Sequence, residues 1–175
     1  PIINMIRMLT NKLFFFKPVS IALLLCFTFI LGCKNPPSKE VEPVPSMLNL
    51  NHLDNLGEVV TYNGQKIRLI HIYAEAPDYN WVGDSDEGIS CVDDVARAAV
   101  VYLRHFELTG NEESSKKAKQ LLRFILYMQN EDGLFNNFVF SNQLDKNTTH
   151  QNSVADEMNW WAARAIWALG TGARV

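Results

Sequence analysis

Three stretches of the chain carry apolar residues at the three-to-four spacing that is typical of amphipathic helices. The first runs from about Cys91 to Leu108, the second from about Glu112 to Gln129, and the third from about Val154 to Leu169. Gly110 and Asn111 separate the first two stretches and supply a helix stop followed by an N-cap. The short connection predicts that these two helices form an antiparallel hairpin.

A β-hairpin is expected upstream of these helices, between Gly57 and Tyr73. Two runs rich in β-branched residues flank the dipeptide Asn63-Gly64, which is the strongest short signal for a type I′ turn. The segment from Tyr73 to Gly88 then reads YAEAPDYNWVGDSDEG and combines aromatic residues with carboxylates. It is expected to be a loop.

The N-terminal part of the chain predicts export. An apolar run of about 13 residues follows Arg7, Lys12 and Lys17, which is the length of a signal-peptide core rather than of a membrane span. The run ends in Ile30-Leu31-Gly32-Cys33, which resembles a bacterial lipobox in which Cys33 would be lipidated. A plain signal peptide or a short membrane anchor is the alternative.

We therefore divide the chain into a lipoprotein signal at 1–32, a proline-rich tether at 33–46 and a folded domain at 47–175. The expected location is outside the cytoplasm, with the lipid in the bacterial outer membrane and the domain in the periplasm or at the cell surface. Nothing after the third helix covers its tryptophans, so this domain is expected to be the N-terminal part of a larger helical one.

Charge and composition narrow the classes of partner. The formal net charge of −3 over 175 residues provides no basic surface for nucleic acid. The histidines are isolated from one another and have no metal-ligand spacing. Neither a metal nor a cofactor is predicted, and the membrane is expected as a partner only through lipid on Cys33.

Three segments resemble the six-hairpin glycosidases, in particular lipoproteins of Bacteroidetes-type bacteria. They read EGISCVDDVARAAVVYLRHFELTG, LLRFILYMQNEDGLFNNF and NWWAARAIWALGTG. The resemblance implies a mainly α fold, here part of an (α/α)6 toroid of helical hairpins that follows the small β-hairpin. It also implies a carbohydrate ligand, an oligosaccharide or polysaccharide, but it does not select a reaction.

Carboxylates at the start of the first helix are the candidates for catalysis. Glycoside hydrolysis needs two carboxyl groups, and we take Asp94 and Glu87 as the pair. Asp93 and Arg97 are candidates for substrate binding. The competing interpretation is structural, because Ser90 and Asp93 have the spacing of a capping box, and Arg97 is placed for ion pairs with both aspartates.

Aromatic side chains are the candidates for stacking on sugar rings. They are Tyr79 and Trp81 in the acidic loop and Trp160 at the third helix. The alternative is that the loop is merely solvated and that Trp160 packs in the core. Together these features predict a glycosidase-like hydrolase, with a polysaccharide lyase or a non-catalytic glycan-binding lipoprotein as alternatives.

Overall fold

The computed structural model describes residues 48–175. The predicted signal at 1–32, the lipidated Cys33 and the tether at 33–46 lie outside the described residues. The described part contains four helices and three two-stranded antiparallel sheets. It is a small mixed α/β domain, and the prediction of an (α/α)6 toroid is therefore wrong.

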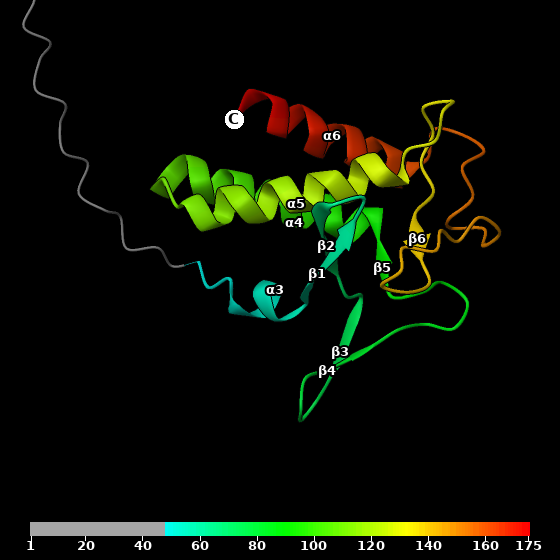
Figure 1. Ribbon diagram of the computed structural model, residues 1–175, viewed down its shortest axis with the longest axis horizontal. Helices are drawn as coiled ribbons and strands as arrows, with labels where there is room; N and C mark the ends of the chain where they lie inside the picture. The colour runs from blue at the N-terminus through cyan, green and yellow to red at the C-terminus, as the bar shows by residue number, and fades with distance from the viewer. Residues whose placement is uncertain (1–47) are drawn as a thin grey trace, which may run out of the picture. The chain divides into compact units, whose positions relative to one another are not determined.

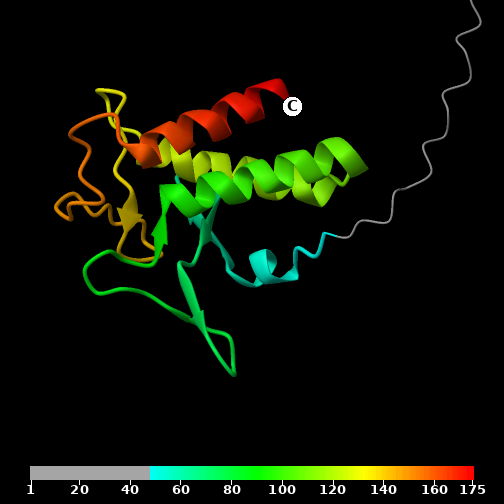
Figure 2. The same ribbon diagram turned by 180° about the vertical axis from the view of Figure 1, so that it is seen from behind.

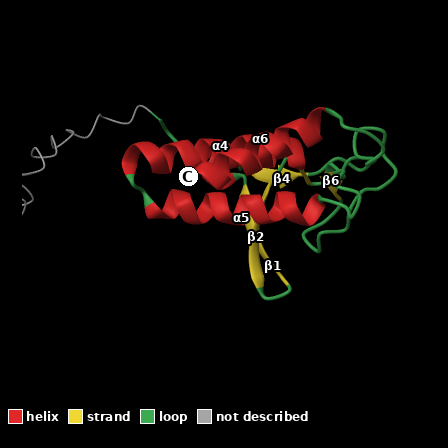
Figure 3. Ribbon diagram, turned by 90° about the horizontal axis from the view of Figure 1, so that it is seen from above, coloured by secondary structure: helices red, strands yellow, loops and turns green. Residues whose placement is uncertain are grey.

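The helical layer consists of three long helices. These are α4 (Val92–Thr109), α5 (Glu112–Met128) and α6 (Trp160–Arg174). Figure 1 shows them stacked along one another, and Figure 3 shows from above that α4 and α5 lie side by side. Only α4 and α5 form a helical hairpin, because a long segment with its own strand separates α5 from α6. The regular succession of hairpins that builds a toroid is absent from residues 48–175.

The start and end signals of α4 and α5 explain why the sequence located this hairpin well. Gly110 ends α4 in the left-handed conformation, with φ of 68°. The Asn111 side chain caps α5 by accepting a hydrogen bond from the Ser114 amide at 2.9 Å. The helix N-cap of α4 is Cys91, not Ser90, because Ser90 lies in a strand and accepts a hydrogen bond from the Ile70 amide instead.

The third helix differs from its prediction at both ends. It begins at Trp160, with Asn159 as the N-cap, and it continues through Gly170 and Gly172. Its buried face consists of Trp161, Ala162, Ala165 and Ala168, which pack toward α4 and α5. Its opposite face is exposed at Trp160, Ile166 and Trp167.

The small sheets lie on one side of the helical layer (Figures 1 and 2). The predicted hairpin is confirmed as β1 (Gly57–Tyr62) and β2 (Gln65–Ile70). Asn63 and Gly64 both have positive φ, as a type I′ turn requires. The inner part of β2, Ile67 to Ile70, is buried and contacts α5.

The segment predicted as a loop contains a second hairpin. It consists of β3 (Tyr73–Glu75) and β4 (Asn80–Val82). The third sheet pairs β5 (Ser90–Cys91) with β6 (Phe138–Val139), and so attaches the start of α4 to the segment after α5. Asn137, next to β6, accepts hydrogen bonds from the first two amides of α4 through its carbonyl and side-chain oxygens.

A charged cluster fastens the short helix α3 (Asn51–Asn55) to the rest of the domain. The Asp54 carboxylate accepts hydrogen bonds from Tyr102 of α4 and Lys117 of α5, each at 2.5 Å. Burial opposes ionisation of Asp54, but the hydrogen bonds from Lys117 and Tyr102 outweigh it and lower the pKa of this carboxyl below its ordinary value. The cluster therefore joins three helices at one point.

Candidate functional site

The first turn of α4 holds the two aspartates that the sequence selected. Their side chains have different environments, as expected for neighbours that point about 100° apart on a helix. The Asp93 side chain is 9% exposed, whereas that of Asp94 is 36% exposed. The two carboxylates therefore have to be considered separately.

Asp93 is held between two arginines. It pairs with Arg97 one turn further along α4 and with Arg164 of α6. Both guanidinium groups are partly exposed, but the carboxylate itself is buried. Asp93 thus serves as an internal anion that joins α4 to α6, which agrees with the structural interpretation of this residue.

Asp94 lines a cavity of about 300 Å³ between α3, β2 and α4. Its carboxylate accepts a hydrogen bond from Arg97 at 2.9 Å and one from the Cys91 thiol at 3.3 Å. Burial, together with the Asp94 carboxylate, raises the pKa of this thiol, so Cys91 acts as a buried capping group. The walls are mostly apolar: Leu53, Leu56, Ile70, Ile72, Ala98 and Val101.

Arg97 makes its ion pairs on its own helix. It contacts Asp93 and Asp94 through its side-chain nitrogens and also donates to the Asp93 carbonyl. The Nη2 atom is thus occupied by the two carboxylates and Nε by a carbonyl, whereas the structure gives Nη1 no bond among the described residues.

The second hairpin places the two loop aromatics differently. Tyr79 sits at the turn with φ of 62°, and its ring meets the edge of the His52 ring. Trp81 of β4 stacks on His71, with ring centroids 4.0 Å apart and planes 11° apart. The indole nitrogen also donates to the Asn55 carbonyl at 2.7 Å. Trp81 is thus oriented by two contacts and still remains 45% exposed.

Trp81 forms part of a groove of about 430 Å³, which we call the Trp81 groove. Its size falls in the range of about 300–1,000 Å³ that is usual for ligand pockets. Glu58 of β1 and His71 form one wall, and the segment after β6 forms another. The lining residues are Glu58, His71, Trp81, Gly83, Ile89, Phe140, Ser141 and Asn142.

Glu58 and His71 form a hydrogen-bonded pair in this groove. The Nε2 atom of His71 lies 2.9 Å from a carboxylate oxygen of Glu58. A carboxylate only accepts, so Nε2 carries the proton and donates it to the bond. The other oxygen of Glu58 accepts a hydrogen bond from the Asn142 amide at 3.2 Å. The Nδ1 atom of His71 is buried and has no hydrogen-bond partner.

His71 links the two hollows, because it lines both the Asp94 cavity and the Trp81 groove. Glu87, the predicted partner of Asp94, lines neither of them. It lies in the acidic loop, where the buried amide of Asn147 donates to the Asp86 and Glu87 carbonyls. The carboxylate connected to the Asp94 cavity through His71 is Glu58.

Trp160 lies elsewhere, at the start of α6. It is 49% exposed, and its ring meets that of Trp161 edge to face. The centroid of the Trp160 ring lies 5.5 Å from the guanidinium carbon of Arg164. The interpretation of Trp160 as a core residue is therefore wrong, whereas Trp161 is buried. Trp160 does not line the Trp81 groove.

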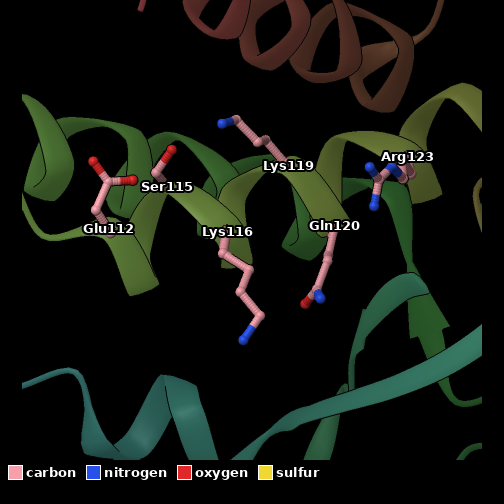
Figure 4. A pocket seen from close by; sticks show the side chains of 6 residues that line it. All are labelled: Glu112, Ser115, Lys116, Lys119, Gln120 and Arg123. Atoms are coloured by element: carbon pink, nitrogen blue, oxygen red, sulfur yellow. The ribbon is translucent and has the colours of Figure 1, made fainter. Parts of the chain in front are cut away.

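A separate polar hollow runs along α5 (Figure 4). It is lined by Glu112, Ser115, Lys116, Lys119, Gln120 and Arg123. Lys116 pairs with Glu113, and Arg123 donates to the Lys66 carbonyl, so these cations already have partners. None of the residues that the sequence selected lies there.

Other kinds of site were also considered within residues 48–175. No group of three or more His, Cys, Asp or Glu side chains is arranged to hold a metal ion. No helix in the same range has the length and apolar character to cross a membrane. Comparison with protein-family models gives no match for this chain, and comparison with curated proteins also gives none.

Proposed function

We propose that this chain belongs to an exported, lipid-anchored protein that binds an oligosaccharide in the Trp81 groove. One observation carries the proposal: an exposed, oriented indole shares a groove with a carboxylate that has vacant acceptor positions. An aromatic face suits the C–H face of a sugar ring, and a few fixed polar groups suit its hydroxyls.

Binding is tested by replacing the indole. Trp81→Ala is expected to weaken oligosaccharide binding about tenfold or more, since the stacking surface is lost. The measurement is calorimetric titration with cello-, xylo-, chito- and chitosan oligosaccharides and oligogalacturonides. Trp167→Ala is the matched control, because Trp167 is equally exposed but lies on α6. Trp81→Phe retains a ring and should keep part of the affinity.

Equal weakening by the two alanine variants would contradict the assignment of the groove. Failure of the parent protein to bind any of these saccharides would also contradict the proposal. Trp81 also donates a hydrogen bond to the Asn55 carbonyl, so its loss could disturb the structure. Thermal unfolding of each variant therefore separates lost binding from lost structure.

Hydrolysis is the second candidate function. It is favoured by the partly exposed Asp94 carboxylate, which lies in a cavity that shares His71 with the Trp81 groove. In this proposal Asp94 is one catalytic carboxyl group and Glu58 replaces Glu87 as the other. Assaying the titration mixtures for new reducing ends decides between binding and cleavage. Products that the parent forms and a folded Asp94→Asn variant does not would favour the hydrolase.

The lipid anchor is tested by Cys33→Ser. This variant is expected to move from the membrane fraction to the soluble fraction and to lose incorporation of a clickable fatty acid, because serine offers no thiol to acylate. Cys26→Ser is the matched control, since Cys26 lies inside the apolar run of the signal. Fatty-acid labelling that persists in Cys33→Ser would contradict the assignment of Cys33.

A further inference from the structure

The formal charges around the Trp81 groove are negative. Glu58 is the only carboxylate among the lining residues, and no lysine or arginine lines the groove. The carboxylate of Asp145 lies just behind the wall, where it accepts the Ser141 hydroxyl at 2.7 Å. The only basic lining residue is His71, which is already paired with Glu58.

Most side-chain donors in the groove that could hold an anionic ligand are already in use. His71 gives its Nε2 proton to Glu58, and Ser141 gives its hydroxyl proton to Asp145. Asn142 directs one amide hydrogen to Glu58 and retains one. Arg97, which was predicted to bind substrate, lines the other cavity and is occupied by two aspartates. A sugar carboxylate in this groove would therefore face Glu58 without a countercharge.

The acceptors, in contrast, have vacant positions. Each oxygen of Glu58 accepts a single hydrogen bond, one from His71 and the other from Asn142, whereas a carboxylate oxygen has two lone-pair positions. The exposed rings of Trp81 and Phe140 border the same space. A carboxylate next to aromatic faces is a suitable environment for an ammonium group.

We infer that the Trp81 groove selects amino sugars with a free, protonated amine over their N-acetylated forms, and that it rejects uronic acids. This inference rests on the proposed saccharide binding and specifies the class of sugar. The amine of the sugar would donate to Glu58 and lie against Trp81. Acetylation removes the charge and keeps the sugar ring, so the two forms differ at the group that Glu58 would recognise.

The experiment compares three probes of similar length by calorimetric titration of the full chain at mildly acidic pH. They are a chitosan oligosaccharide with free amines, the N-acetylated chitooligosaccharide and an oligogalacturonide. The chitosan oligosaccharide should bind on the order of tenfold more tightly than its acetylated form, as a charge-assisted hydrogen bond implies. The oligogalacturonide should not bind measurably.

Glu58→Gln tests the residue that is responsible. It should bring the affinity for the chitosan oligosaccharide down to that for the acetylated form, because the amide carries no charge. Glu75→Gln is the matched control, since Glu75 is an exposed carboxylate in the neighbouring hairpin that does not line the groove. If Glu58→Gln does not fold, salt provides the second measurement, because added NaCl should reduce the preference of the parent protein.

If the oligogalacturonide or the acetylated form bound more tightly than the chitosan oligosaccharide, the inference about amino sugars would be overturned. The proposal that the groove binds saccharides would be unaffected. A preference for the amine that survives Glu58→Gln or high salt would also overturn it. Failure of all three probes would count against saccharide binding as such, so the two failures can be told apart.

Discussion

Replacing Asp93 by alanine is expected to lower the free energy of unfolding by about 2–4 kcal/mol. The substitution removes a buried anion that two arginines from different helices contact. Breaking a fully buried pair costs about 3–5 kcal/mol, and here the remaining guanidinium groups are partly exposed, so water recovers part of the loss. The loss should be largest where α6 meets α4.

The measurement is equilibrium unfolding in urea, compared with Glu113→Gln. Glu113 also pairs with a basic residue, Lys116, but both side chains are more than half exposed on α5. An exposed pair of this kind contributes little, so the control should unfold like the parent protein. A stability of Asp93→Ala indistinguishable from that of the control would show that Asp93 does not join the two helices in solution.

The helices that the sequence located well are those whose ends carry local signals. Gly110 and Asn111 separate α4 and α5, and their roles depend only on nearby backbone atoms. The start of α6 was placed too early because the apolar spacing continues upstream of Asn159, the actual N-cap. Its end was also misplaced, because the helix continues through Gly170 and Gly172 instead of stopping after Leu169. A Cβ on Gly172 would lie 2.5 Å from a methyl carbon of Leu122.

The fold class was wrong because it rested on the helical segments alone. The resemblance concerned those segments only, and the prediction included the sheets only as one small β-hairpin before the helices. Strands β5 and β6 are two residues each and are separated by the whole of α4 and α5. Elements so short have no periodicity that a sequence pattern could reveal.

The candidate site could be predicted in part. The mixture of aromatic residues and carboxylates indicated Trp81, which the structure places in a groove. Glu58 and His71 were missed, although the hairpin register contains the signal. The two-residue turn fixes Gly57 opposite Ile70, and His71 continues the ladder by donating its amide to the Leu56 carbonyl. Glu58 is then a diagonal neighbour of His71 on the same face. Their approach to Trp81 depends on tertiary structure, which the local pattern does not contain.

Gly88→Ala is expected to destabilise the domain by about 3 kcal/mol or more, because it combines backbone strain with a steric clash. Gly88 has φ of 128°, a conformation that a residue with a Cβ rarely adopts. An added Cβ would lie 2.2 Å from the Val139 carbonyl oxygen, which accepts the hydrogen bond from the Ile89 amide. The strand β6 must therefore move, which pulls on the β5 pairing that precedes α4.

Gly133→Ala separates the two contributions. Gly133 also has positive φ, at 88°, but a Cβ there has no neighbour within 4 Å. This control should lose about 1 kcal/mol from strain alone. Urea unfolding of both variants gives the difference, and hydrogen exchange at the Ile89 amide locates it. Equal losses of unfolding free energy in the two variants would mean that strand β6 moves away from the added Cβ at little cost. The walls of the Trp81 groove formed by Ile89 and Phe140 would then not be rigidly held.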